Sequence, residues 1–185
     1  MTVDQAQAQI RAAFVDGGPG AMVSALVWLI AGYVYATGTP ASAFVALFVG
    51  GIFIFPVSVL ICKLAFARSG SVQGNPLGLV ALESTIAMIG GLLAAWLLLA
   101  ARPDMVFPVA ALAVGTHYFA FKTAYGDRTF WVLGALLTLV AAAAIFLVRG
   151  QTLALILAIA IIELAFGLWL TIRSVRAARS GTIAG

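Results

Sequence analysis

The chain has 185 residues, of which 64% are hydrophobic and only 9% are charged. Soluble domains carry about 25% charged residues, so this composition excludes a soluble globular protein. Ten basic residues outnumber six acidic ones, but their spread along the chain fits a membrane-topology signal better than a nucleic-acid-binding surface. The single cysteine, Cys62, excludes an intramolecular disulfide and a Cys-rich metal site.

A largely polar segment, residues 1–19, precedes the first long apolar run. Val3, Ala6 and Ile10 recur there at helical spacing, and Thr2 begins a capping-box pattern. We predict a short amphipathic helix that lies at the cytoplasmic membrane interface. We expect it to act as an anchor, and a gating or docking role is the alternative.

Six apolar runs follow this segment. They cover residues 20–37, 40–65, 76–101, 104–122, 129–148 and 151–172. An α-helix needs about 20 residues to cross a ~30 Å hydrocarbon core, and each run is close to that length. The sequence therefore predicts an all-α, polytopic membrane helix bundle with six transmembrane helices in residues 20–173. A basic cytoplasmic tail is expected in residues 174–185, and the connections are too short for a separate soluble domain.

The basic residues divide unevenly between the two sides of this bundle. Only Arg102 and Arg149 fall on one side. Lys and Arg accumulate in cytoplasmic loops of membrane proteins, so we expect both termini in the cytoplasm and the chain in the cell inner membrane. The eight residues of the other side are Arg11, Lys63, Arg68, Lys122, Arg128, Arg173, Arg176 and Arg179.

A short motif, Ala-Arg-Ser-Gly, occurs at residues 67–70 and again at residues 178–181. The copies follow the second and sixth runs, which are predicted to cross the membrane in the same direction. Any internal repeat would therefore be parallel and built from helical hairpins.

Three ionisable residues, Glu83, His117 and Glu163, lie inside apolar runs. A charge in the hydrocarbon core costs about 2.5–3.5 kcal/mol even on lenient scales, so such residues usually face the protein interior and mark a functional site. Small residues share a helix face with Glu83 and with His117, and we expect both side chains to point into the bundle. Glu163 should lie near the midplane, and its bulkier neighbours leave its direction open.

Other polar side chains surround His117 in the densest polar stretch of the chain. Lys63 either pairs with a buried carboxylate or extends toward the membrane surface. His117 either takes part in a binding site or joins helices through a hydrogen bond to Glu83 or to a backbone carbonyl. The candidate binding residues are Glu83, His117, Glu163, Tyr118, Lys122, Tyr125, Arg128 and Lys63.

The order of several polar motifs resembles a family of small bacterial multi-pass membrane proteins recorded as a domain of unknown function. The resemblance covers residues 44–131, and the chain departs from the family pattern at Thr116 and Ala120. It implies that Asn75, His117, Tyr125 and Arg128 belong together, which adds Asn75 to the candidate residues, and it implies no activity. The motifs are Phe55-Pro56 followed by Lys63, Asn75-Pro76-Leu77-Gly78, Gly115-Thr116-His117-Tyr118, and Tyr125 with Arg128.

Carboxylates and an imidazole in a low dielectric suit the binding of a proton or a hard cation. We therefore predict a small transporter or channel whose cytoplasm-facing polar site binds a proton, a cation or a small solute. The alternative is a structural or accessory membrane protein whose polar residues hold helices together or bind a partner or anionic lipid headgroups.

An intramembrane enzyme is disfavoured because the chain has one histidine and no His-Glu-x-x-His motif. We predict no catalytic residue, metal or cofactor. The expected partners are the lipid bilayer and a second copy of the chain, without nucleic acid.

Overall fold

The computed structural model describes residues 1–182, and within that range the secondary structure is helical and contains no strand. Six helices are long and apolar enough to cross a membrane, as the sequence predicted. Two 3₁₀ turns, η1 (Val15–Gly17) and η2 (Pro103–Met105), precede α2 and α5. The α-helices are α1 (Val3–Phe14), α2 (Gly18–Thr37), α3 (Pro40–Phe66), α4 (Leu77–Leu97), α5 (Val106–Tyr125), α6 (Thr129–Phe146) and α7 (Thr152–Thr182).

Local signals in the sequence explain where the helices begin and end. The Thr39 side chain accepts a hydrogen bond from the Ser42 N–H at 3.1 Å, which caps the start of α3. Gly126 ends α5 in the left-handed region at φ 67°, where its N–H donates to the Lys122 carbonyl. The predicted boundaries therefore hold to within a few residues for most of the bundle.

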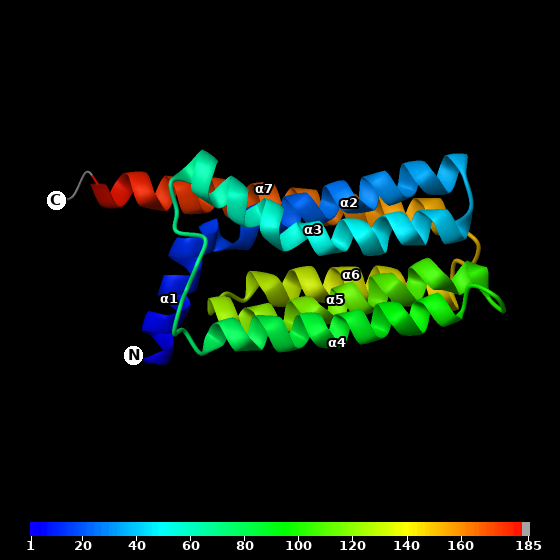
Figure 1. Ribbon diagram of the computed structural model, residues 1–185, viewed down its shortest axis with the longest axis horizontal. Helices are drawn as coiled ribbons and strands as arrows, with labels where there is room; N and C mark the ends of the chain where they lie inside the picture. Colours follow the sequence, from blue (N-terminus) through cyan, green and yellow to red (C-terminus); the bar gives the residue numbers. More distant parts are fainter. Residues whose placement is uncertain (183–185) are drawn as a thin grey trace.

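The C-terminal boundary differs from the prediction. We expected the sixth run to end at 172 and a separate tail to follow, but α7 continues to Thr182. Residues 173–180 contain neither glycine nor proline, and arginine and alanine are good helix formers. The helix therefore extends beyond the bundle (Figure 1). Residues 183–185 of the predicted tail lie outside the described residues.

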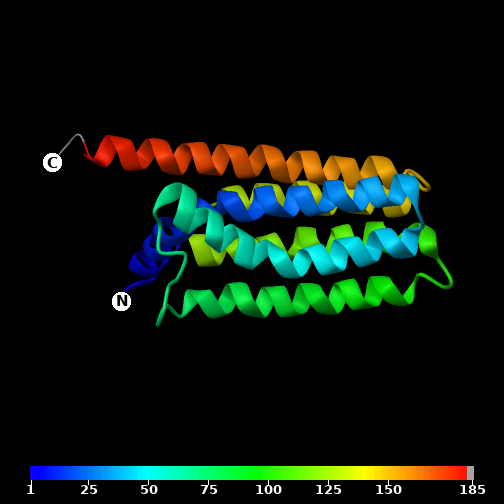
Figure 2. The ribbon, with the colours of Figure 1, turned by 45° about the horizontal axis from the view of Figure 1, so that its top comes forward.

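The six long helices form two layers of three (Figure 1). In one layer α2 packs between α3 and α7, and in the other α5 packs between α4 and α6. The layers are joined mainly through α6 and α7 along one side. On the opposite side the α3 and α4 ribbons run apart in the turned view of Figure 2, and their side chains meet where the Phe44 and Trp96 ring centroids lie 5.6 Å apart. The chain thus forms an open bundle rather than a closed ring.

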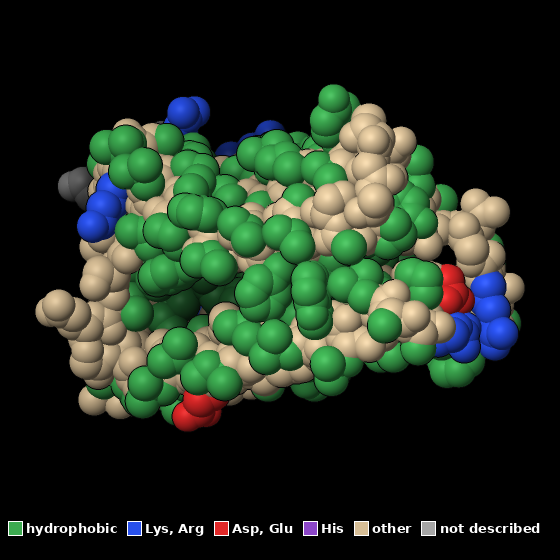
Figure 3. Space-filling view, turned by 45° about the vertical axis from the view of Figure 1, so that its right-hand side comes forward, with side chains coloured by type: hydrophobic (Ala, Val, Ile, Leu, Met, Phe, Trp, Pro, Cys, Tyr) green, Lys and Arg blue, Asp and Glu red, His purple; other side chains and the backbone are tan. Residues whose placement is uncertain are grey.

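An apolar pocket of about 270 Å³ lies between α3 and α4. The face shown in Figure 3 is mostly hydrophobic and hollowed in places, while Lys and Arg gather toward its ends. This distribution is the one expected for helices that face lipid. The pocket is lined by Phe44, Val45, Phe48, Val49, Leu93 and Trp96.

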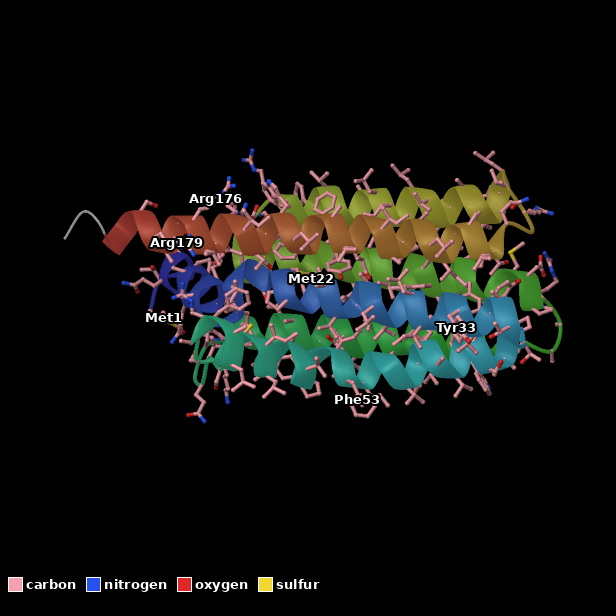
Figure 4. All side chains as sticks on the ribbon, turned by 90° about the horizontal axis from the view of Figure 1, so that it is seen from above. Met1, Met22, Tyr33, Phe53, Arg176 and Arg179 are labelled. Atoms are coloured by element: carbon pink, nitrogen blue, oxygen red, sulfur yellow. The ribbon has the colours of Figure 1, made fainter. Side chains whose placement is uncertain are left out.

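Glycines bring the backbones of α2 and α7 into direct contact. A Cβ atom on Gly167 would lie 2.8 Å from the backbone nitrogen of Met22, which Figure 4 labels on α2. A Cβ atom on Gly18 would lie 2.7 Å from the Gly167 carbonyl oxygen. The α5–α6 pair is similarly close, because a Cβ atom on Gly134 would lie 3.0 Å from the Gly115 carbonyl oxygen. Small residues allow such close packing between membrane helices.

Both termini lie at the same end of the bundle (Figure 1), and α1 packs across that end. Its capping box is formed by Thr2 and Gln5, as the sequence predicted. Its apolar residues Ala6, Ile10 and Ala13 are buried. Helix α1 therefore covers the ends of the spanning helices with its apolar face.

Candidate functional site

A carboxyl group lies enclosed at the centre of the bundle. Glu163, near the middle of α7, has no exposed surface. The Tyr118 hydroxyl from α5 donates a 2.8 Å hydrogen bond to its Oε1 atom. Ser24 of α2 is buried and lies beside both side chains. Three helices from the two layers thus meet around one acidic residue.

The second oxygen of this carboxyl group is free to accept a hydrogen bond. Within the described part of the chain, Glu163 Oε2 is buried and has no partner at hydrogen-bonding distance and angle. Buried polar atoms are nearly always satisfied in native proteins, and exceptions often mark a place for a proton, an ion or water. We call Glu163, Tyr118 and Ser24 the central acidic site.

Aromatic packing fixes the position of the Tyr118 ring. It stacks on Phe130 of α6 with ring centroids 6.4 Å apart and 13° between the ring planes. Phe121 contacts both rings edge-on, with centroids 5.7 Å from each. The hydroxyl group is therefore held toward α7 by the packing of its own ring.

A second unsatisfied polar atom lies nearby on α6. The Thr138 Oγ1 atom is buried and has no partner among the described residues. A Cβ atom placed on Gly115 would lie 2.8 Å from it. Gly115 is three residues before Tyr118, so Thr138 contacts α5 about one helical turn from Tyr118.

His117 faces a different helix from its neighbour Tyr118. Its Nδ1 atom is 2.6 Å from the Ser84 Oγ atom of α4, and its ring contacts Phe121. Consecutive residues on a helix diverge by about 100°, so His117 faces α4 while Tyr118 faces α7. The hydrogen bond between helices that we considered for His117 exists, but its partner is Ser84 rather than Glu83 or a backbone carbonyl.

The expectation that Glu83 points into the bundle is wrong. Glu83 is exposed on the outward face of α4 and forms no hydrogen bond or ion pair with any residue of the described range. Helix α4 packs on α5 through another face, where a Cβ atom on Gly91 would lie 2.6 Å from Ala113 Cβ. Ala87 and Gly90 are exposed beside Glu83. Small residues occur on both faces of α4, so they could not identify its inner face.

Three basic candidates lie outside the bundle interior. Lys63 is exposed, and no carboxylate of the described residues pairs with it. The predicted pairing of Lys63 with a buried carboxylate is therefore absent from this part of the chain. The Lys122 ammonium lies 5.3 Å from the centre of the Trp131 ring. Arg128 is exposed at the start of α6. None of the three contacts the central acidic site.

Asn75 and Tyr125 hold α1 against the bundle. The buried Asn75 amide donates to the Ala6 carbonyl at 2.9 Å and to Gln9 Oε1 at 2.8 Å. The Arg11 guanidinium donates to the Tyr125 carbonyl. The grouping implied by the family resemblance thus applies to Asn75 and Tyr125, because both contact α1, while His117 and Arg128 lie elsewhere.

An ionic cluster at the same end was not predicted. The Arg173 guanidinium donates to the Asp127 carboxylate, lies 3.6 Å from Asp16 Oδ2, and stacks over Trp169. Burial opposes ionisation of Asp127, but hydrogen bonds from Arg173 and Thr129 outweigh it and hold the pKa of the Asp127 carboxyl below its usual range. This cluster fastens η1 and the α5–α6 connection to α7.

The residues that sequence reasoning missed are mostly hydroxyls. Ser24 and Thr138 stand in apolar runs, where a hydroxyl can bond its own helix backbone and gives little signal. Asp16 and Arg173 carry complementary charges, but they lie far apart in the sequence, which gives no signal that they meet. Residues 1–182 contain no cluster of three His, Cys, Asp or Glu side chains able to hold a metal ion.

Six apolar helices around an enclosed carboxyl group define a helical membrane protein. A family model described as a family of unknown function (DUF7010) matches residues 3–173, and the chain belongs to this family. The match confirms the resemblance to an uncharacterised family and extends it over nearly the whole chain. Neither a curated protein nor a solved structure matches the chain.

Proposed function

We propose that this protein is a small proton-conducting transporter whose central acidic site carries the proton. The observation that supports the proposal most directly is the unpartnered, fully buried Oε2 atom of Glu163. An ionisable side chain at membrane depth is costly to keep and usually lies on a proton or ion pathway.

The ligand set favours a proton over a metal cation. The central acidic site offers one carboxylate, from Glu163, and two hydroxyls, from Tyr118 and Ser24. Calcium takes about six to eight oxygen ligands, and magnesium demands about six in octahedral geometry. A proton needs one acceptor oxygen, which Oε2 provides. Tyr118 holds the other oxygen, so the carboxyl group keeps its orientation in both protonation states.

Access to the site requires helix movement. Glu163 has no exposed surface, so the described conformation is closed to both sides. Gly167 lies one turn from Glu163 and contacts Met22 of α2. Sliding of α2 against α7 at this glycine contact would open the site, because packed helices shift most readily by small sliding movements.

We further propose that the protein lies in the cell inner membrane and that both of its termini are in the cytoplasm. The support is the excess of Lys and Arg at the end that carries the termini. In this orientation α1 lies at the cytoplasmic interface and covers the bundle end through Asn75 and Arg11. His117 has a structural role, because its partner Ser84 joins α5 to α4.

Proton flux into proteoliposomes tests the proposal directly. Purified protein is reconstituted with an internal pH-sensitive dye, and a potassium gradient with valinomycin sets the membrane potential. The expected result is flux above that of protein-free vesicles, with loss of at least tenfold in Glu163→Gln. The matched control is Glu83→Gln, which makes the same chemical change on the outward face. Equal flux in wild type and in a monodisperse Glu163→Gln variant would refute the proposal.

A second candidate function, that of an accessory protein bound to another membrane protein, rests on Glu83. Its carboxyl group lies on an outward face of α4 beside the exposed small residues Ala87 and Gly90. A partner helix would supply both close packing and a hydrogen bond to the carboxyl group. Loss of a co-purifying partner in Glu83→Ala, with proton flux absent in wild type, would favour this function.

A further inference from the structure

A pocket of about 390 Å³ lies at the end of the bundle that carries the termini. It is formed by the end of α3, by η1 and by the extension of α7 beyond the bundle. Its walls combine apolar side chains with two arginines. The lining includes Val15, Ala65, Phe66, Val175, Arg68 and Arg179.

The two arginines come from the two copies of the Ala-Arg-Ser-Gly motif. Arg68 belongs to the copy after α3, and Arg179 belongs to the copy in α7. Helices α3 and α7 flank α2 in the same layer, so the equivalent positions of both copies reach one pocket. The repeated motif therefore contributes two arginines to the lining of one pocket.

Both guanidinium groups are available to a ligand. Within residues 1–182 neither the Arg68 nor the Arg179 side chain forms a hydrogen bond or ion pair. The acidic residues of the ionic cluster, Asp16 and Asp127, are already engaged by Arg173. Figure 4 shows Arg179 on the extension of α7, near the end that carries α1. The pocket thus has unbalanced positive charge.

We propose that this pocket binds the phosphate headgroup of an anionic phospholipid. Guanidinium groups match phosphate oxygens with paired hydrogen bonds, and two of them suit a headgroup with a phosphodiester charge. The apolar walls suit the glycerol and the first acyl carbons. The pocket also lies at the ends of the spanning helices, at the depth of lipid headgroups. A freely soluble anion would make no use of the apolar walls.

This proposal is independent of the proton site, because the pocket and Glu163 share no residue. Its test is lipid retention by the full-length protein in detergent, measured by native mass spectrometry. Phosphatidylglycerol and phosphatidylcholine of equal chain length are titrated separately. A Lys or Arg near an anionic headgroup strengthens binding about fivefold, so Arg68→Gln with Arg179→Gln should weaken phosphatidylglycerol binding about 30-fold. Phosphatidylcholine binding should change little.

The matched control is Arg128→Gln with Arg176→Gln, which removes two exposed charges at the same end but outside the pocket. The proposal predicts near wild-type phosphatidylglycerol binding in this control. An equal loss in both double variants would overturn it, since general surface charge would then explain the binding. Displacement of the lipid by millimolar inorganic phosphate would also overturn the assignment to a lipid. Size-exclusion profiles and melting temperatures confirm that each variant is folded.

Discussion

The hydrogen bond between Tyr118 and Glu163 offers the sharpest test of the central acidic site. Tyr118→Phe removes only the hydroxyl and keeps the ring packed on Phe130. Oε2 of Glu163 has no partner among the described residues, so this substitution removes the one direct hydrogen bond to the carboxyl group and leaves only the nearby Ser24 hydroxyl beside it. Glu163→Met removes the carboxyl group and fills most of its volume, which takes away the carboxylate that accepts from the Tyr118 hydroxyl.

The expected coupling energy follows from this geometry. A hydrogen bond to a charged group in a soluble protein contributes about 1.5–3 kcal/mol. Double-mutant cycles between membrane helices average about 0.6 kcal/mol and reach about 1.7 kcal/mol. The 2.8 Å bond joins the fully buried Glu163 carboxyl group to Tyr118, which is only 6% exposed, so its coupling should lie in the upper part of that range, at about 1–1.7 kcal/mol.

The assay is reversible unfolding in mixed micelles with rising dodecyl sulfate, followed by tryptophan fluorescence. Wild type, Tyr118→Phe, Glu163→Met and the double variant form the cycle, so the cost of each single change cancels. The inferred contact is refuted if the changes in unfolding free energy of the two single variants sum to that of the double variant within about 0.5 kcal/mol. Independent sites are additive in that way.

Two further predictions concern helix packing and pH. Gly167→Ala should destabilise the protein by about 1–3 kcal/mol, because its Cβ atom would lie 2.8 Å from the Met22 nitrogen. The control Gly51→Ala has open space around the new Cβ atom and should be neutral or stabilising in the same assay. The Asp127 pKa is lowered in the folded state, so the stabilisation from Arg173 is complete above the ordinary value of 3.8 and is lost as pH falls through the lower folded value. Asp127→Asn should lower the free energy of unfolding by about 1 kcal/mol at pH 7. Its melting temperature should fall less than that of the wild type below pH ~4. A variant with the same acid profile as the wild type would contradict this account.

Part of the fold could be predicted because membrane helices have a strong one-dimensional signal. Hydrocarbon thickness sets the length of each apolar run, and backbone groups in lipid must be satisfied within the helix. The apolar runs therefore indicated the helix limits without knowledge of any neighbour. The extension of α7 was missed because the prediction stopped at Arg173, where hydrophobicity ended but helix propensity did not.

The direction of each polar side chain could not be predicted in the same way. Glu83 and Glu163 are chemically identical and both stand in apolar runs, yet one is exposed and the other is fully enclosed. The small residues that were expected to mark the inner face of α4 occur on two faces of it. Only the packing of α4 on α5, and of α7 on α2, distinguishes the two carboxyl groups.

The three ionisable residues that the sequence singled out thus separate in space. Glu163 lies at the centre with Tyr118, His117 joins α4 and α5 through Ser84, and Glu83 faces outward. The sequence by itself determined the helical membrane class, the number of spanning helices and the presence of costly charges, because these depend on length and composition. The tertiary structure alone decided which charge is enclosed and which hydroxyl it meets, because burial depends on contacts between helices far apart in the chain.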